Sequence, residues 1–147
     1  MSLKRVRIGE LIAVVGTGCI VASLVLPWYE NATGKLDAWQ TFGPSIVLLI
    51  VACVAALWLV IAVITERSSA LPIAAAVWCT LFAFIAVIAA LFRVFERPQH
   101  AHSMCVAPWL ALAGAFLILI GAWQSLRDER ADLYSPGEAE LRKLPVS

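Results

Sequence analysis

Four long stretches of this 147-residue chain contain no charged residue, and they constrain its fold more than any other feature. They are 19, 28, 25 and 24 residues long and cover positions 11–29, 38–65, 68–92 and 103–126. A helix needs about 20 apolar residues to cross the hydrocarbon core of a bilayer, and two crossings joined by a turn need about 40. Each stretch is therefore long enough for one membrane span and too short for two.

The composition agrees with a membrane protein. Hydrophobic residues make up 62% of the chain and charged residues 14%, whereas about a quarter of a soluble domain is charged. The net charge of +1 lacks the basic excess of proteins that bind nucleic-acid phosphates, so we expect no nucleic-acid partner. We predict an all-α membrane protein that forms a four-helix transmembrane bundle of up-down-up-down topology.

The predicted helical domain covers residues 1–126, and residues 127–147 form a polar tail. Within the domain, the four spans are expected at about 8–28, 43–65, 70–92 and 106–126. The first span follows a basic segment, as in a signal peptide. However, it is long for a signal peptide and ends in Leu26-Pro27-Trp28-Tyr29 instead of small residues, so we expect it to be retained.

The distribution of Lys and Arg predicts the orientation of the bundle. One side carries eight of these residues: Lys4, Arg5, Arg7, Arg67, Arg127, Arg130, Arg142 and Lys143. The other side carries three: Lys35, Arg93 and Arg97. Because cytoplasmic loops are enriched in Lys and Arg, both termini and the 127–147 tail are predicted to lie in the cytoplasm.

The six tryptophans lie near the ends of the predicted spans. Trp28, Trp39 and Trp109 fall near the outer ends, and Trp58, Trp78 and Trp123 fall nearer the inner ends. An indole favours the headgroup level, where its ring is buried and its N–H stays hydrated. This placement predicts two aromatic belts, although the deeper rings could instead pack between helices.

Glu10 is the one acidic residue inside a predicted span, one turn from the start of the first helix. A carboxylate within a span often serves as a cation or proton site. At this shallow depth we favour a simpler interpretation, in which Glu10 lies at the interface and pairs with Arg7 or with lipid headgroups.

The second external loop concentrates side chains that can bind a metal. Two imidazoles, a thioether and a thiol occur within six residues: His100, His102, Met104 and Cys105. These ligand types suit copper or zinc. The alternative is a surface loop of mixed polarity without a bound cofactor, which is the interpretation we favour.

Small residues recur at helical spacing in several spans. Those expected to support helix packing are Gly16, Gly18, Ala22, Gly114 and Gly121, with Gly9 on the same stripe as Gly16. Because lipid is as apolar as a leucine side chain, close backbone approach at small residues is a main source of helix association in a bilayer. The pattern fits closure of the bundle and fits a homo-oligomer equally well.

Three short segments lie at the predicted span ends: residues 26–29 (LPWY), 38–43 (AWQTFG) and 121–129 (GAWQSLRDE). In these segments the chain resembles small, uncharacterised four-helix membrane proteins of the actinobacterial type. The resemblance implies a multi-pass protein of a bacterial plasma membrane, and it implies no particular activity.

The predicted spans contain few groups that could perform chemistry, and no Cys-x-x-Cys pair occurs. We therefore predict no catalytic residues and a non-enzymatic integral membrane protein, a scaffold or accessory subunit that acts through helix and loop contacts. Its expected partners are the lipid bilayer and either a larger membrane complex or further copies of itself. The alternatives are a small oligomeric channel or transporter, and a copper-binding or metal-binding redox protein that uses the 100–105 loop.

Overall fold

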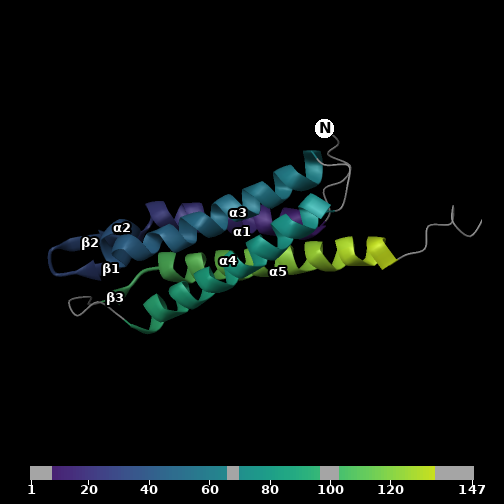
Figure 1. Ribbon diagram of the computed structural model, residues 1–147. Coiled ribbons are helices and arrows are strands. Elements are labelled where there is room, and N and C mark those ends of the chain that lie inside the picture. Colours follow the sequence, from purple (N-terminus) through teal and green to yellow (C-terminus); the bar gives the residue numbers. More distant parts are fainter. Residues whose placement is uncertain (1–7, 66–69, 97–102, 135–147) are drawn as a thin grey trace, which may run out of the picture.

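Four long helices form the body of the protein in a computed structural model that describes residues 8–65, 70–96 and 103–134 (Figure 1). They are α1 (Ile8–Val25), α3 (Ile46–Thr65), α4 (Ala70–Phe95) and α5 (Ala107–Tyr134). Within the described residues, the four segments Ile8–Val25, Gly43–Thr65, Leu71–Phe95 and Ala107–Asp128 are long and apolar enough to cross a membrane. The predicted number of candidate spans is therefore confirmed.

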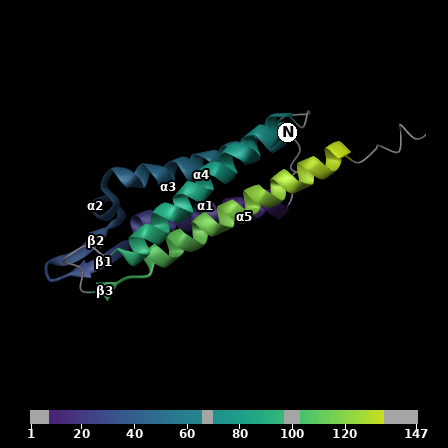
Figure 2. The same cartoon turned by 60° about the horizontal axis from the view of Figure 1, so that its bottom comes forward.

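The helices pack around a core of small side chains. The most extensive contact joins α1 to α5, which also packs on α4, while α4 packs on α3 and α3 reaches α1 (Figures 1 and 2). Fourteen alanines that are 5% exposed or less lie in this core cluster at helix positions: Ala13, Ala38, Ala52, Ala55, Ala56, Ala62, Ala75, Ala76, Ala83, Ala86, Ala107, Ala111, Ala115 and Ala122. Short side chains let neighbouring helix backbones approach closely, as the sequence pattern indicates.

A small sheet lies at one end of the bundle, where the sequence analysis expected only connecting loops (Figure 1). Its strands are β1 (Pro27–Asn31), β2 (Gly34–Asp37) and β3 (Ser103–Met104), in the order β2-β1-β3. Both pairings are antiparallel. The all-α prediction is therefore incomplete, and the first span is shorter than predicted because α1 ends at Val25 and the chain becomes extended from Pro27.

The turn between β1 and β2 has the local chemistry of a tight hairpin. Asn31 pairs with Gly34, which leaves two residues in the loop. The Thr33 backbone N–H donates to Oδ1 of Asn31 at 3.1 Å, and Gly34 has a φ of +145°, a value that side chains disfavour. Polar and glycine residues at these positions thus direct the chain back along β1.

Two aromatic residues of β1 fix the sheet to the helices, and both are fully buried. The Trp28 indole donates to the Ser23 carbonyl at 2.8 Å, and the Tyr29 hydroxyl donates to the carbonyl of Arg93 at the end of α4. The Cys105 backbone N–H donates to the Trp28 carbonyl at 3.0 Å. Trp28 is therefore a core residue and not part of an aromatic belt, whereas the other five tryptophans are between 43% and 59% exposed.

The second candidate span begins where predicted, whereas α4 and α5 end later than predicted. After β2, α2 (Ala38–Phe42) and a 3₁₀ turn, η2 (Gly43–Ser45), lead into α3, so the second helical segment starts where predicted. At its C-terminal end, α4 continues to Phe95, beyond the predicted end at residue 92. Similarly, α5 continues to Tyr134, eight residues beyond the predicted end at residue 126, because the charged sequence after Leu126 still suits a helix.

Candidate functional site

Glycines let α1 and α5 approach each other until their backbones touch. A Cβ atom added at Gly16 would lie 2.6 Å from the Gly114 carbonyl oxygen and 2.8 Å from the Ile118 amide nitrogen. The relation is reciprocal, since a Cβ at Gly114 would lie 2.7 Å from the Gly16 carbonyl oxygen. These distances are shorter than van der Waals contacts of carbon with oxygen or nitrogen. Neither position therefore accepts a side chain unless the two helices move apart.

A second glycine pair lies one heptad away. A Cβ at Gly9 would lie 2.8 Å from the Gly121 carbonyl oxygen, and a Cβ at Gly121 would in turn meet the Gly9 carbonyl oxygen. Residue number rises along α1 as it falls along α5 in these contacts, so the two helices are antiparallel. The predicted packing residues Gly16, Gly114 and Gly121 thus all lie in one contact within the chain.

The other two predicted packing residues lie elsewhere. Gly18 and Ala22 are exposed on α1, and a Cβ added at Gly18 would meet no atom within 4 Å. Gly18 therefore makes no close helix contact within the chain, and a role of this pair in an oligomer stays a prediction. Because residues two apart on a helix are separated by about 200°, Gly18 points away from the side on which Gly16 meets α5.

A buried carboxylate lies at the end of the glycine-lined contact. Glu10 is 1% exposed and Ser125 is 0% exposed. The Ser125 hydroxyl donates to Oε1 of Glu10 at 2.6 Å, at the short end of the range for O–H···O hydrogen bonds. The expectation that Glu10 lies among lipid headgroups is therefore wrong, and Arg7, its other suggested partner, lies outside the described residues.

The glycines explain why Glu10 is so deeply buried. The Cβ position of Gly9, the residue before Glu10, lies 2.9 Å from the Ser125 amide nitrogen. Since the helices touch at this level, the carboxylate of Glu10 has α5 beside it where water or lipid would otherwise lie. Ser125 was not among the predicted site residues, although its position four residues after Gly121 places it on the same small-residue stripe.

The other hydroxyls inside the helices bond to their own backbone. Thr17 donates to the Ala13 carbonyl at 2.9 Å, Ser23 to the Ile20 carbonyl at 2.6 Å and Thr80 to the Ala76 carbonyl at 2.7 Å. In the described part of the chain, no buried side-chain nitrogen or oxygen lacks a hydrogen-bond partner. The interior polar groups are thus locally satisfied, as folding in an apolar environment requires.

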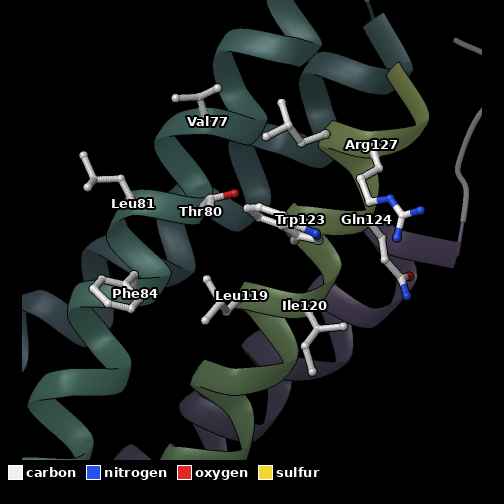
Figure 3. Close-up of a pocket in the computed structure, with 10 residues that line it drawn as sticks. Val77, Thr80, Leu81, Phe84, Leu119, Ile120, Trp123, Gln124 and Arg127 are labelled. Carbon is white, nitrogen blue, oxygen red and sulfur yellow. The ribbon is translucent and has the colours of Figure 1, made fainter. Parts of the chain in front are cut away.

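A groove of about 670 Å³ opens on the opposite side of α5, between that helix and α4 (Figure 3). Its walls are mostly apolar side chains of both helices: Val77, Leu81, Phe84, Leu119, Ile120 and Leu126. Trp123, Gln124 and Arg127 line it at the end of α5 that leads out of the apolar span. A concave apolar surface with a few polar groups at one end is the usual form of a ligand site.

A smaller hollow of about 280 Å³ lies between α3 and α4, on the half of α4 nearer the sheet. It is lined by Leu48, Ile85, Ile88 and Phe92, with Ser45 and Arg93 as its polar members. Both hollows thus combine apolar helix faces with an arginine near the end of a helix, but the α4–α5 groove is more than twice as large.

The predicted metal-binding loop is only partly within the described residues. Met104 belongs to β3 and pairs with Tyr29, and Cys105 follows it, half-buried. His100 and His102 lie outside the described residues, so the structure does not place the four side chains together. Among the residues that are described, no group of three or more His, Cys, Asp or Glu side chains could hold a metal ion. Metal binding by this loop stays a prediction.

Comparisons with protein-family models, with curated proteins and with solved structures found no match to this chain. The resemblance to small actinobacterial membrane proteins therefore stays a hypothesis.

Proposed function

We propose that this protein is a non-enzymatic integral membrane protein that acts as a scaffold or accessory subunit of a larger membrane complex. In this proposal the four spans alternate in direction across a bacterial plasma membrane, with both termini in the cytoplasm. The excess of Lys and Arg on the side of the two termini supports that orientation. The many large apolar side chains on the outer surface, from Leu11 on α1 to Trp123 on α5, support a location in lipid.

The observation that carries the proposal is the length of α5. Its apolar part ends near Asp128, and the helix continues without a break to Tyr134. At 1.5 Å per residue, the last six residues add about 9 Å of helix beyond the apolar part. This extension is rich in charge, with Glu129, Arg130 and Asp132, so it suits an aqueous contact.

The extension continues directly from a part of α5 that is packed on α1. The glycine contact with α1 reaches up to Gly121, and the Glu10–Ser125 hydrogen bond lies one turn further along α5. The α1–α5 contact thus reaches to within three residues of Asp128. A polar segment that continues a packed helix suits a docking function, because less backbone ordering entropy is lost on binding than for an unstructured segment.

Affinity purification from the native host in a mild detergent tests this proposal. The full-length chain, tagged at its N-terminus, is compared with one truncated after Tyr134 and one truncated after Asp128. We expect a constant set of partners with the full-length chain and their loss on truncation after Asp128. The matched control is Trp39→Ala, which alters an exposed side chain at the sheet end and should leave recovery unchanged. Repeated recovery of a solitary monomer would contradict the proposal.

Reporter fusions test the orientation separately. A green fluorescent protein fused after Ser147 should be fluorescent, and alkaline phosphatase fused at the same position should be inactive, because only the cytoplasm supports the first result and excludes the second. The reverse pattern would place the C-terminus outside and would contradict the proposed topology.

The alternative is a small oligomeric channel or transporter, and the Glu10–Ser125 pair is the observation that favours it. A carboxylate buried within an apolar helix is commonly retained for ion or proton transfer. Ion flux into liposomes that contain the purified protein tests this function. Flux that is abolished by Glu10→Gln and unchanged by Glu30→Gln, at the exposed hairpin, would support a channel or transporter over a scaffold.

A further inference from the structure

We propose that the groove between α4 and α5 is a binding site for one anionic phospholipid, with an acyl chain in the groove and the phosphate beside Arg127. This inference rests on the membrane location in the proposed function and goes beyond the scaffold role. The groove belongs to neither the α1–α5 contact nor the charged extension after Asp128.

The walls of the groove fit an acyl chain. Along α4 the lining residues run from Val77 to Phe84, and along α5 they run from Leu119 to Arg127. These ranges span seven and eight residue steps, which correspond to about 10–12 Å of helix, so the groove extends lengthwise between the two helices. The side chains along most of this length are aliphatic or aromatic, and several are 46–53% exposed, which leaves apolar surface available for contact.

The polar end of the groove fits a phosphate. Among the described residues that line it, Arg127 is the one charged side chain, and it is exposed. Gln124 and Trp123 supply amide and indole donors at the same end (Figure 3). An arginine guanidinium binds phosphate oxygens in a bidentate manner, and basic pockets between transmembrane helices are a common form of anionic-lipid site.

The order of these groups along α5 matches the order of groups in a lipid. Leu119 and Ile120 come first, then Trp123, and finally Arg127 at the boundary of the apolar segment that ends at Asp128. Tryptophan favours the headgroup level, and arginine favours the phosphate level just beyond it. Charge and depth together therefore select an anionic phospholipid over a neutral one, and over a second protein helix, which would not need a cation at this position.

Native mass spectrometry of the full-length protein in detergent, titrated with phosphatidylglycerol or phosphatidylcholine, tests the proposal. We expect one phosphatidylglycerol per chain, bound at least about fivefold more tightly than phosphatidylcholine, which is the selectivity that one arginine near a phosphate provides. Arg127→Gln should remove that preference. Lys35→Gln, which removes one exposed cation at the sheet end, should preserve it.

A second pair of variants tests the position of the lipid. Quenching of tryptophan fluorescence by brominated phosphatidylglycerol should fall clearly in Trp123→Leu and should change less in Trp109→Leu. The pair is matched because both side chains lie on α5 and both are 56% exposed. The proposal is overturned by equal binding of the two lipids to the wild type, by an equal effect of Arg127→Gln and Lys35→Gln, or by a lipid-free dimer that covers the groove.

Failure of this test and failure of the proposed function are distinguishable. A protein that is extracted from membranes only by detergent, and that binds the two lipids equally, keeps its membrane location and loses the lipid site. A protein that is released from membranes by carbonate washing loses the membrane location itself, and with it the basis of both proposals.

Discussion

On one side of α5, Gly114 and Gly121 bring α1 into backbone contact, whereas on the other side Leu119, Ile120 and Trp123 border an open groove towards α4. The two contacts share a helix and differ in the size of the residues that face the neighbour. Where both helices have glycine, their backbones touch, and we call this contact sealed. The sealed contact also encloses the carboxylate of Glu10. Where both offer large apolar side chains, space remains for another molecule. One helix thus separates a face that stabilises the protein from a face that is available for binding.

Adding a side chain to the sealed contact should give the largest effect. We expect Gly16→Leu to cost more than about 3 kcal/mol of unfolding free energy, since even its Cβ would lie 2.6 Å from a carbonyl oxygen. Thermal unfolding of the purified protein in detergent, followed by circular dichroism, measures this loss.

Gly18 provides the matched control for that substitution. It lies two residues further along the same helix, and a Cβ there meets nothing within 4 Å. Gly18→Leu should therefore leave the stability unchanged or raise it by up to about 1 kcal/mol, because leucine favours helix more than glycine does. Equal destabilisation by both variants would show that the α1–α5 contact is not specific to one face of α1.

The hydrogen bond at the end of the sealed contact should have the next largest effect. Ser125→Ala leaves the buried Glu10 carboxylate without the hydroxyl that lies 2.6 Å from it, and we expect a loss of about 1–3 kcal/mol. Ser103→Ala is the control, because its hydroxyl also meets a glutamate, Glu30, but at 3.4 Å on the exposed surface. That variant should lose less than about 0.5 kcal/mol. Chemical unfolding of both variants shows whether burial of the hydrogen bond is the cause of the larger loss of stability.

The sheet lies at the C-terminal ends of α1 and α4, and its anchoring hydrogen bond should contribute less to the unfolding free energy. Tyr29→Phe removes the hydroxyl that bonds to the Arg93 carbonyl and keeps the buried ring, so we expect a loss of about 1 kcal/mol. Trp39→Phe, at an exposed position after β2, should change the unfolding free energy by less than about 0.5 kcal/mol. Similar losses from both would mean that the sheet is not anchored through Tyr29.

The helical part of this fold could be predicted because it depends on local sequence. Four uncharged stretches are enough to count the candidate spans, and Gly16 and Gly114 stand out by their type and spacing. The sheet could not be predicted in the same way. Its β1–β3 pairing joins Glu30 to Ser103, which are 73 residues apart, and β3 is only two residues long.

The same distinction explains the error at Glu10. Depth along α1 suggested an interfacial carboxylate, but its burial depends on the close approach of α5, which brings Ser125, 115 residues away, against it. Nothing in the sequence around Glu10 shows which helix faces it. The groove was missed for a related reason, since residues of α4 and α5 line one groove only when these two helices pack together. Pairings between distant segments, more than the elements themselves, are therefore what the structure adds.

The smallest effect should come from enlarging a side chain on the open face of α5. Ile120 is 47% exposed and lines the groove, so Ile120→Phe should change the unfolding free energy by less than about 0.5 kcal/mol. Ile118, two residues earlier on α5, is fully buried and lies 2.9 Å from the Cβ position of Gly16. Ile118→Phe should therefore cost about 1–3 kcal/mol.

The same chemical change thus tests both faces of one helix, with thermal unfolding as the common measurement. If the two variants were equally stable, the α1 side of α5 would be as adaptable as the groove, and the contrast between a sealed and an open face would not hold. If Ile120→Phe also weakened phosphatidylglycerol binding while leaving stability intact, this result would show that the open face takes part in lipid binding. A tolerated substitution that alters binding is the behaviour expected of a surface that contributes little to the folded state.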